Sequence, residues 1–235
     1  MKNKKQNGNV LFLILIAVVL FAALSYAVTQ SSRGGGSATS EKNMLTASQL
    51  FQYGTSLSTA IMRMQINGVA DTEVCFYTGS NHADYNHAGC ADDTNNVFHP
   101  DGGGATYQAP PAGIHDGTEW EFTARAQIWG QGSTTPGSPT ADDVDLFMVI
   151  RDVNDDVCLA INQQVGLTST PVDSGDLNVA RFNGVYSGGV DNLDGCPSNC
   201  ASLAVSPIAS NNLNTGCFQE NDTSENVFFY TLIAR

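Results

Sequence analysis

An uncharged apolar run over residues 10–28 constrains this chain more than any other feature. A helix needs about 20 apolar residues to cross a lipid bilayer, and this run has nearly that length. Lys2, Lys4 and Lys5 precede it, and the positive-inside rule places such a basic flank in the cytoplasm. The run therefore predicts a single-pass inner-membrane protein with an extracytoplasmic domain.

Three fates are open for this apolar segment. It can remain as an uncleaved anchor. It can be a secretory signal peptide, because Ser25-Tyr26-Ala27 has the small-x-Ala pattern of a cleavage site. It can also be cut at its cytoplasmic edge, directly before the apolar run. These fates differ in whether the helix stays attached to the domain that follows.

The basic leader of residues 1–8 ends in Gly8 and directly precedes the apolar run. This arrangement resembles the signal of type IV pilins and type II secretion pseudopilins. The resemblance implies cleavage by a prepilin peptidase between Gly8 and Asn9, and assembly through the N-terminal helix with like or related subunits. Such a subunit would end in a cell-surface or periplasmic filament. That family usually has Phe or Met at the position of Asn9 and Glu at the position of Leu13. The absence of this Glu implies a minor subunit.

Local sequence patterns divide the chain into a leader (1–8), a transmembrane or filament-core helix (9–30), a Gly-rich linker (31–39) and an extracytoplasmic domain (40–235). A second helix is predicted near 40–67. Apolar residues recur along it at helical spacing and form one stripe, and Asn67-Gly68 is a typical C-terminal stop. The stripe consists of Leu50, Tyr53, Leu57, Ile61 and Met64.

Apolar runs between polar loops predict the strands of this domain. The candidates are 73–77, 119–129, 145–151, 157–161 and 226–234. The turn-forming residues 154–156 predict that the third and fourth of these make a hairpin. The predicted fold class is α+β: a long hydrophobic N-terminal helix followed by an antiparallel, β-rich, disulfide-bonded globular domain with a pilin-like layout.

The charge distribution argues against two classes of partner. The formal net charge is −13, and all 23 Asp and Glu residues lie at or after Glu41. An acidic surface of this kind repels nucleic acid and anionic lipid, so no nucleic-acid partner is expected. Solubility explains the charge, and attraction of divalent cations or of a basic protein is the alternative.

Six cysteines follow the apolar run, and an even number in a translocated domain predicts disulfides. Proximity in the sequence favours the pairs Cys75–Cys90, Cys196–Cys200 and Cys158–Cys217. The alternative is a zinc site, because Cys196 and Cys200 have metal-like spacing and Cys217 adds a third thiolate.

Two segments carry weak metal signals. His82, Asp84, His87 and Asp92 offer nitrogen and oxygen ligands, although an exposed polar loop also explains them. Asp152, Asn154 and Asp156 resemble the start of a calcium loop but lack its glycine and closing Glu, and residues 191–195 are similarly partial. No cofactor is expected. Calcium is the alternative, and Asp- and Asn-rich turns explain both segments without it.

No catalytic motif is present: the sequence has no Gly-x-Ser-x-Gly elbow, no His-Glu-x-x-His helix and no phosphate-binding glycine loop. The leading hypothesis is therefore a non-enzymatic structural subunit, of the minor type, in a pilus-like or pseudopilus-like filament. The alternatives are a membrane-anchored surface binding protein or adhesin that does not assemble, and a metal-dependent extracytoplasmic enzyme built on the histidine loop.

Overall fold

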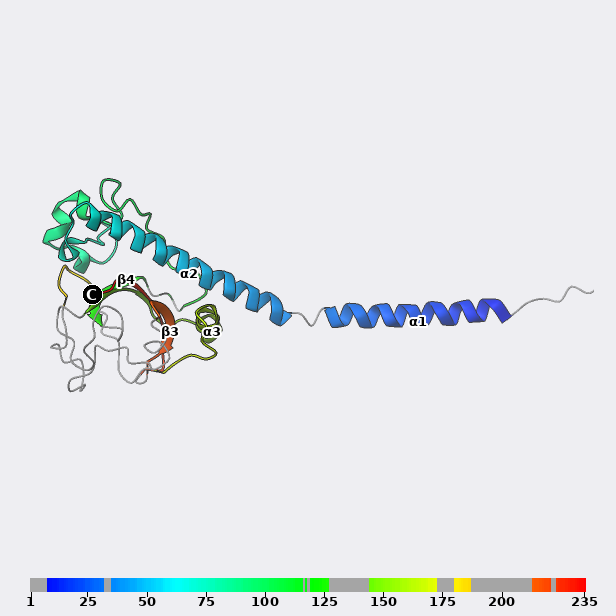
Figure 1. Cartoon of the computed structure of the whole chain (residues 1–235). Helices are drawn as coiled ribbons and strands as arrows, with labels where there is room; N and C mark the ends of the chain where they lie inside the picture. The colour runs from blue at the N-terminus through cyan, green and yellow to red at the C-terminus, as the bar shows by residue number, and fades with distance from the viewer. Residues whose placement is uncertain are drawn as a thin grey trace, which may run out of the picture. The chain divides into compact units, whose positions relative to one another are not determined.

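The chain forms two compact units, Met1–Lys42 and Asn43–Arg235, in a computed structural model (Figure 1). The structure describes residues 8–31, 35–115, 117, 119–126, 144–172, 180–186, 213–220 and 223–235.

The first unit contains α1, Gly8–Ser31. The side chains described in it, residues 12–26, are all exposed. Its large apolar side chains are 40% to 72% exposed, and they are Phe12, Leu13, Ile14, Leu15, Ile16, Val18, Val19, Leu20, Phe21, Leu24 and Tyr26. Apolar residues thus occupy all sides of the helix.

Two predictions about this helix are wrong. Among the residues that the structure describes, no helix combines the length and apolarity that a membrane crossing requires. This finding overturns the predicted single-pass inner-membrane localisation and the membrane-crossing helix of the predicted fold class. The mixed α+β composition, the antiparallel sheet and the disulfides of that fold class are present.

The helix α2 runs from Gly35 to Ile66, so it begins before residue 40, where the sequence predicted its start. Extending a formed helix adds one hydrogen bond per residue, which offsets the low helix propensity of the glycines. The predicted stop is confirmed. Gly68 has φ 98°, and the amides of Gly68 and Val69 donate to the carbonyls of Gln65 and Met64 in a Schellman arrangement.

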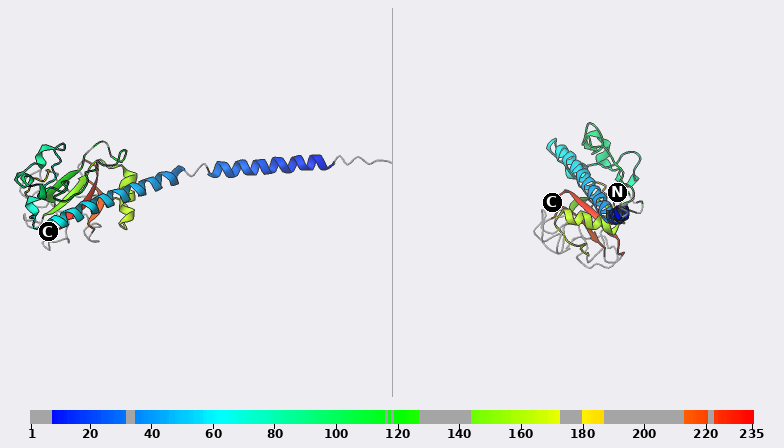
Figure 2. Two further views of the ribbon diagram at one scale, coloured as in Figure 1. Left: turned by 90° about the horizontal axis from the view of Figure 1, so that it is seen from above. Right: turned by 90° about the vertical axis from the view of Figure 1, so that its right-hand side faces the viewer.

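The second unit is built on a four-stranded antiparallel sheet with the order β1-β2-β4-β3 (Figure 2). The strands are β1 (Glu121–Ala126), β2 (Asp145–Ile150), β3 (Thr215–Gln219) and β4 (Asn226–Ile233). The apolar stripe of α2 is buried in one core with Leu146, Met148 and Phe228. Phe147, Val149 and Phe229 point to the opposite face and form a smaller core there.

The predicted hairpin between residues 145–151 and 157–161 is wrong, because the second run lies in α3, Asp155–Gln164. Val157, Cys158 and Ile161 are buried at helical spacing, and Asp155 and Asp156 occupy the first turn, where the helix dipole favours acidic residues. An apolar run this short fits a strand and a buried helix equally well, so its periodicity could not decide between them.

The segment after α2 is held by short helical turns instead of the predicted strand at 73–77. Only an isolated bridge joins Cys75 to Asn96. The turns are η2 (Asp71–Glu73), η3 (Ala83–Tyr85), η4 (Ala88–Ala91) and η5 (Asp93–Asn95). Side-chain amides form hydrogen bonds with backbone carbonyls across the segment. Asn81 Nδ2 donates to the Phe76 carbonyl, and Asn96 Nδ2 donates to the Tyr77 carbonyl. The segment therefore keeps a defined shape without the hydrogen bonds of a β-sheet.

Gly54 sets the distance between α2 and β4. A Cβ atom built at Gly54 would lie 2.4 Å from Cδ2 of Tyr230, inside van der Waals contact. The Tyr230 hydroxyl bonds the Thr55 hydroxyl at 3.1 Å, which holds the ring in place. The close approach of the two elements therefore depends on the missing side chain.

We expect Gly54→Ala to lower the free energy of unfolding by about 2 kcal/mol, the usual cost of overpacking, although alanine is the better helix former. Chemical denaturation of the wild type, Gly54→Ala, Tyr230→Ala and the double variant measures this. In the Tyr230→Ala background the ring is gone, so Gly54→Ala should be neutral or stabilising. An equal loss in both backgrounds would contradict the steric explanation.

Candidate functional site

Two disulfides lie in the second unit, Cys75–Cys90 and Cys158–Cys217. These are two of the three pairs predicted from proximity in the sequence. Cys196 and Cys200 lie outside the described residues. Since Cys217 is bonded to Cys158, it does not supply the thiolate that the alternative zinc site required.

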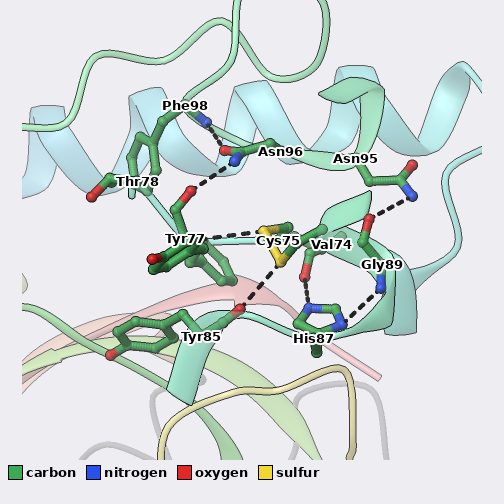
Figure 3. Close-up of a disulfide and its surroundings, with 12 residues drawn as sticks. Val74, Cys75, Tyr77, Thr78, Tyr85, His87, Gly89, Asn95, Asn96 and Phe98 are labelled. Carbon is green, nitrogen blue, oxygen red and sulfur yellow. Dashed lines mark hydrogen bonds between the residues drawn. A yellow bond between two sulfur atoms is a disulfide. The ribbon is translucent and has the colours of Figure 1, made fainter. Parts of the chain in front are cut away.

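The Cys75–Cys90 disulfide forms a cluster with His87, which Figure 3 shows. One ligand atom from each of Cys75, His87 and Cys90 lies within 4.8 Å of the other two. This is the only such group of three His, Cys, Asp or Glu side chains in the part of the chain that the structure describes. Cys75 is fully buried, whereas His87 and Cys90 are partly exposed. The cluster is thus open to solvent on one side.

Both nitrogens of the His87 ring are engaged by backbone groups (Figure 3). Nδ1 accepts the Gly89 amide proton at 3.2 Å, and Nε2 lies 3.1 Å from the Val74 carbonyl oxygen. A nitrogen that accepts carries no proton, so Nε2 must carry it and donate to Val74. These contacts assign His87 as the neutral Nε2–H tautomer with a fixed ring orientation.

The other predicted metal ligands of this segment do not join His87. His82 Nδ1 lies 3.3 Å from Asp84 Oδ2 on the surface. The Asp92 carboxylate accepts from the amide and the hydroxyl of Thr94, and these hydrogen bonds lower its pKa. His82, Asp84, His87 and Asp92 therefore do not form one set of metal ligands.

The residues of the partial calcium motif serve the start of α3. Asn154 is the N-cap residue, and its Nδ2 donates to the Gly113 carbonyl at 2.9 Å. Asp156 lies in the first turn of the helix, and Asp152 has the left-handed φ of 54°. These positions support the turn interpretation. Residues 191–195 lie outside the described part of the chain.

Arg151 gathers three carboxylates at one end of the sheet. Its guanidinium lies 3.1 Å from Glu220, 3.4 Å from Glu121 and 3.8 Å from Glu225. The Glu220 side chain is fully buried, and burial raises the pKa of Glu121 despite the arginine. No local sequence pattern marks these residues, because they come from β1, β2 and the β3–β4 connection, which are distant in the sequence.

A cleft of about 520 Å³ lies between α2 and residues 108–111. Exposed Gln49, Gln52, Ser56 and Gln108 line it, and no charged residue does. Tyr53 and Trp120 form its floor, with ring centroids 5.4 Å apart. This cleft was not predicted either, because its walls come from segments that are distant in the sequence.

The aromatic floor holds the wall of the cleft in place. The Gln108 amide donates to the Tyr53 hydroxyl at 3.2 Å, and Trp120 Nε1 donates to the Gln108 carbonyl at 2.9 Å. Burial raises the pKa of Tyr53 to about 12, so its hydroxyl stays protonated at neutral pH. The cleft is therefore uncharged and lined largely by glutamines, with one wall held by the aromatic rings beneath it.

Gly8 and Asn9, the predicted processing site, are the first residues of α1. No family model, no curated protein and no solved structure matches the chain.

Proposed function

We propose that the protein is a structural subunit, of the minor type, of a pilus-like or pseudopilus-like filament, and that it assembles by packing α1 against the helices of like or related subunits. One observation carries this proposal: every described side chain of α1 is exposed, and most are large and apolar. A helix that is apolar on all sides is stable only when neighbours cover it, and like helices provide such a surface.

The energetics favour assembly of this kind. Covering one large apolar side chain contributes about 1.5–3 kcal/mol, and α1 offers many of them. The uneven charge supports the same arrangement. Since no Asp or Glu precedes Glu41, bundled α1 helices avoid the mutual repulsion that the acidic second unit would cause at close contact.

The leader supports the resemblance to pilin-type subunits. Cleavage between Gly8 and Asn9 would leave α1 at the mature N-terminus. Leu13, which is 59% exposed, stands where the family's major subunits carry Glu. An apolar residue there adds contact surface but no carboxylate for a neighbour's amine, and this favours a minor subunit.

Leu20→Lys tests the proposal, because Leu20 lies in the middle of α1 and is 64% exposed. A charge there would have to be buried in the bundle, so we expect polymers of the wild type and at least about tenfold weaker assembly of the variant. Sedimentation velocity and electron microscopy of the full chain measure this.

Ser40→Lys is the matched control, since it adds the same charge at an exposed position of α2, outside α1. It should assemble like the wild type. A monomeric wild type, or a Leu20→Lys variant that assembles normally, would contradict the proposal. Mass spectrometry of the mature N-terminus adds a second criterion, because processing predicts a start at Asn9.

The second candidate function is a binding module that does not assemble. The uncharged cleft beside α2 favours it, because three glutamines and a serine line it above the rings of Tyr53 and Trp120. A wild type that remains monomeric at all concentrations would make this candidate the stronger one.

A further inference from the structure

We propose that reduction of the Cys75–Cys90 disulfide converts the cluster of Cys75, His87 and Cys90 into a Zn²⁺ site. The three residues offer two thiolates and one imidazole, a ligand set typical of zinc, and water would fill the fourth position. The proposal concerns the second unit alone and does not depend on filament assembly.

The ligand atoms already lie close to the required geometry. They are within 4.8 Å of one another in the disulfide-bonded form. Zn–S and Zn–N bonds of about 2.3 and 2.0 Å place tetrahedral ligand atoms about 3.5 Å apart. Small side-chain rotations would therefore suffice, once the two sulfurs separate to admit the ion.

One ring nitrogen of His87 already lies within 4.8 Å of both sulfurs. Nε2 of His87 already faces the Val74 carbonyl at 3.1 Å. Figure 3 shows Nε2 on the side of the ring that faces the sulfurs and Nδ1 directed toward Gly89. Zinc would therefore bind Nε2 in place of its hydrogen bond to Val74, and the ring proton would move to Nδ1.

Hydrogen bonds hold the backbone around the cluster in addition to the disulfide. The amide and carbonyl of Cys75 bond Asn95 and Val97 at 2.8 and 2.9 Å, respectively. The Cys90 amide donates to the His87 carbonyl at 2.9 Å, and Asn95 Nδ2 donates to the Gly89 carbonyl at 3.1 Å. These bonds would keep both cysteines near His87 after reduction.

Reduction requires a dithiol, and the unequal exposure of the two sulfurs determines which sulfur the dithiol attacks first. A thiolate of the dithiol attacks Sγ of the partly exposed Cys90, and buried Cys75 leaves as the thiolate. The second thiol of the reagent then displaces Cys90, which oxidises the dithiol to a disulfide by two electrons. Zn²⁺ binds the two cysteine sulfurs as thiolates and is not itself reduced or oxidised. Any thiol protons are released on binding.

Co²⁺ serves as the probe, because thiolate-to-cobalt charge-transfer absorption reports sulfur ligation. The full chain is titrated after dithiol treatment and, separately, in its oxidised form. We expect one equivalent of bound Co²⁺ with charge-transfer bands in the reduced protein, displacement by Zn²⁺, and no such bands in the oxidised protein.

His87→Gln and His82→Gln form the matched pair of variants, studied with Cys196 and Cys200 replaced by Ser so that these thiols cannot compete. Loss of His87 should weaken binding at least about tenfold, because even second-shell changes have effects of that size. Loss of the exposed His82 should change nothing. Circular dichroism checks that each reduced chain remains folded. No charge-transfer band in the folded reduced protein, or equal affinity in both variants, would overturn the proposal.

Discussion

Replacing Cys158 and Cys217 together by alanine is expected to lower the free energy of unfolding by about 4 kcal/mol. The disulfide joins residues 59 apart, and closing a loop of this length removes much of the entropy of the unfolded chain. It ties α3 to β3, the edge strand of the sheet. Both cysteines are fully buried, so alanine keeps the site apolar.

Cys75→Ala with Cys90→Ala is the matched control. That disulfide has a sequence separation of 15, for which the same relation predicts a loss of about 3 kcal/mol. Urea denaturation of both double variants under oxidising conditions measures the difference. A larger loss from the shorter loop would show that local packing, and not chain entropy, dominates the contribution of these disulfides.

Asn162→Ala is expected to lower the free energy of unfolding by about 3 kcal/mol, because two buried backbone groups would lose their partners. The fully buried Asn162 side chain accepts the Cys217 amide proton at 2.9 Å and donates to the Cys217 carbonyl at 2.8 Å. These are the groups of β3 that face away from β4. The asparagine therefore acts as a substitute for a further strand at this sheet edge.

Asn162→Asp separates the two hydrogen bonds, since an ionised carboxylate keeps the acceptor and loses the donor. Burial should raise the pKa of this aspartate in the folded protein above its unfolded value, so the variant should become more stable as the pH falls through that range. Denaturation at several pH values measures this. If Asn162→Ala were as stable as the wild type, water would have to satisfy the two groups of Cys217.

Several features of the second unit could be predicted from local sequence. The stripe from Leu50 to Met64 repeats at helical spacing, and Asn67-Gly68 ends the helix through its own backbone preference. The runs at 145–150 and 226–233 are long and apolar enough to predict strands. Proximity also suggested Cys75–Cys90, because a short loop is easily closed.

The sequence by itself thus determined the elements that are encoded locally, in a turn, in an apolar helical stripe or in one apolar run. The tertiary structure decided the rest. Residues 157–161 became a helix because their apolar side chains fit the sheet at helical spacing. The strand β3 formed in a segment that was not predicted as a strand, because β4 supplied its partner. His87 joined the cysteines, and not His82, through backbone contacts at Val74 and Gly89. Such contacts join separate segments of the chain, and no local pattern predicts that these segments come into contact.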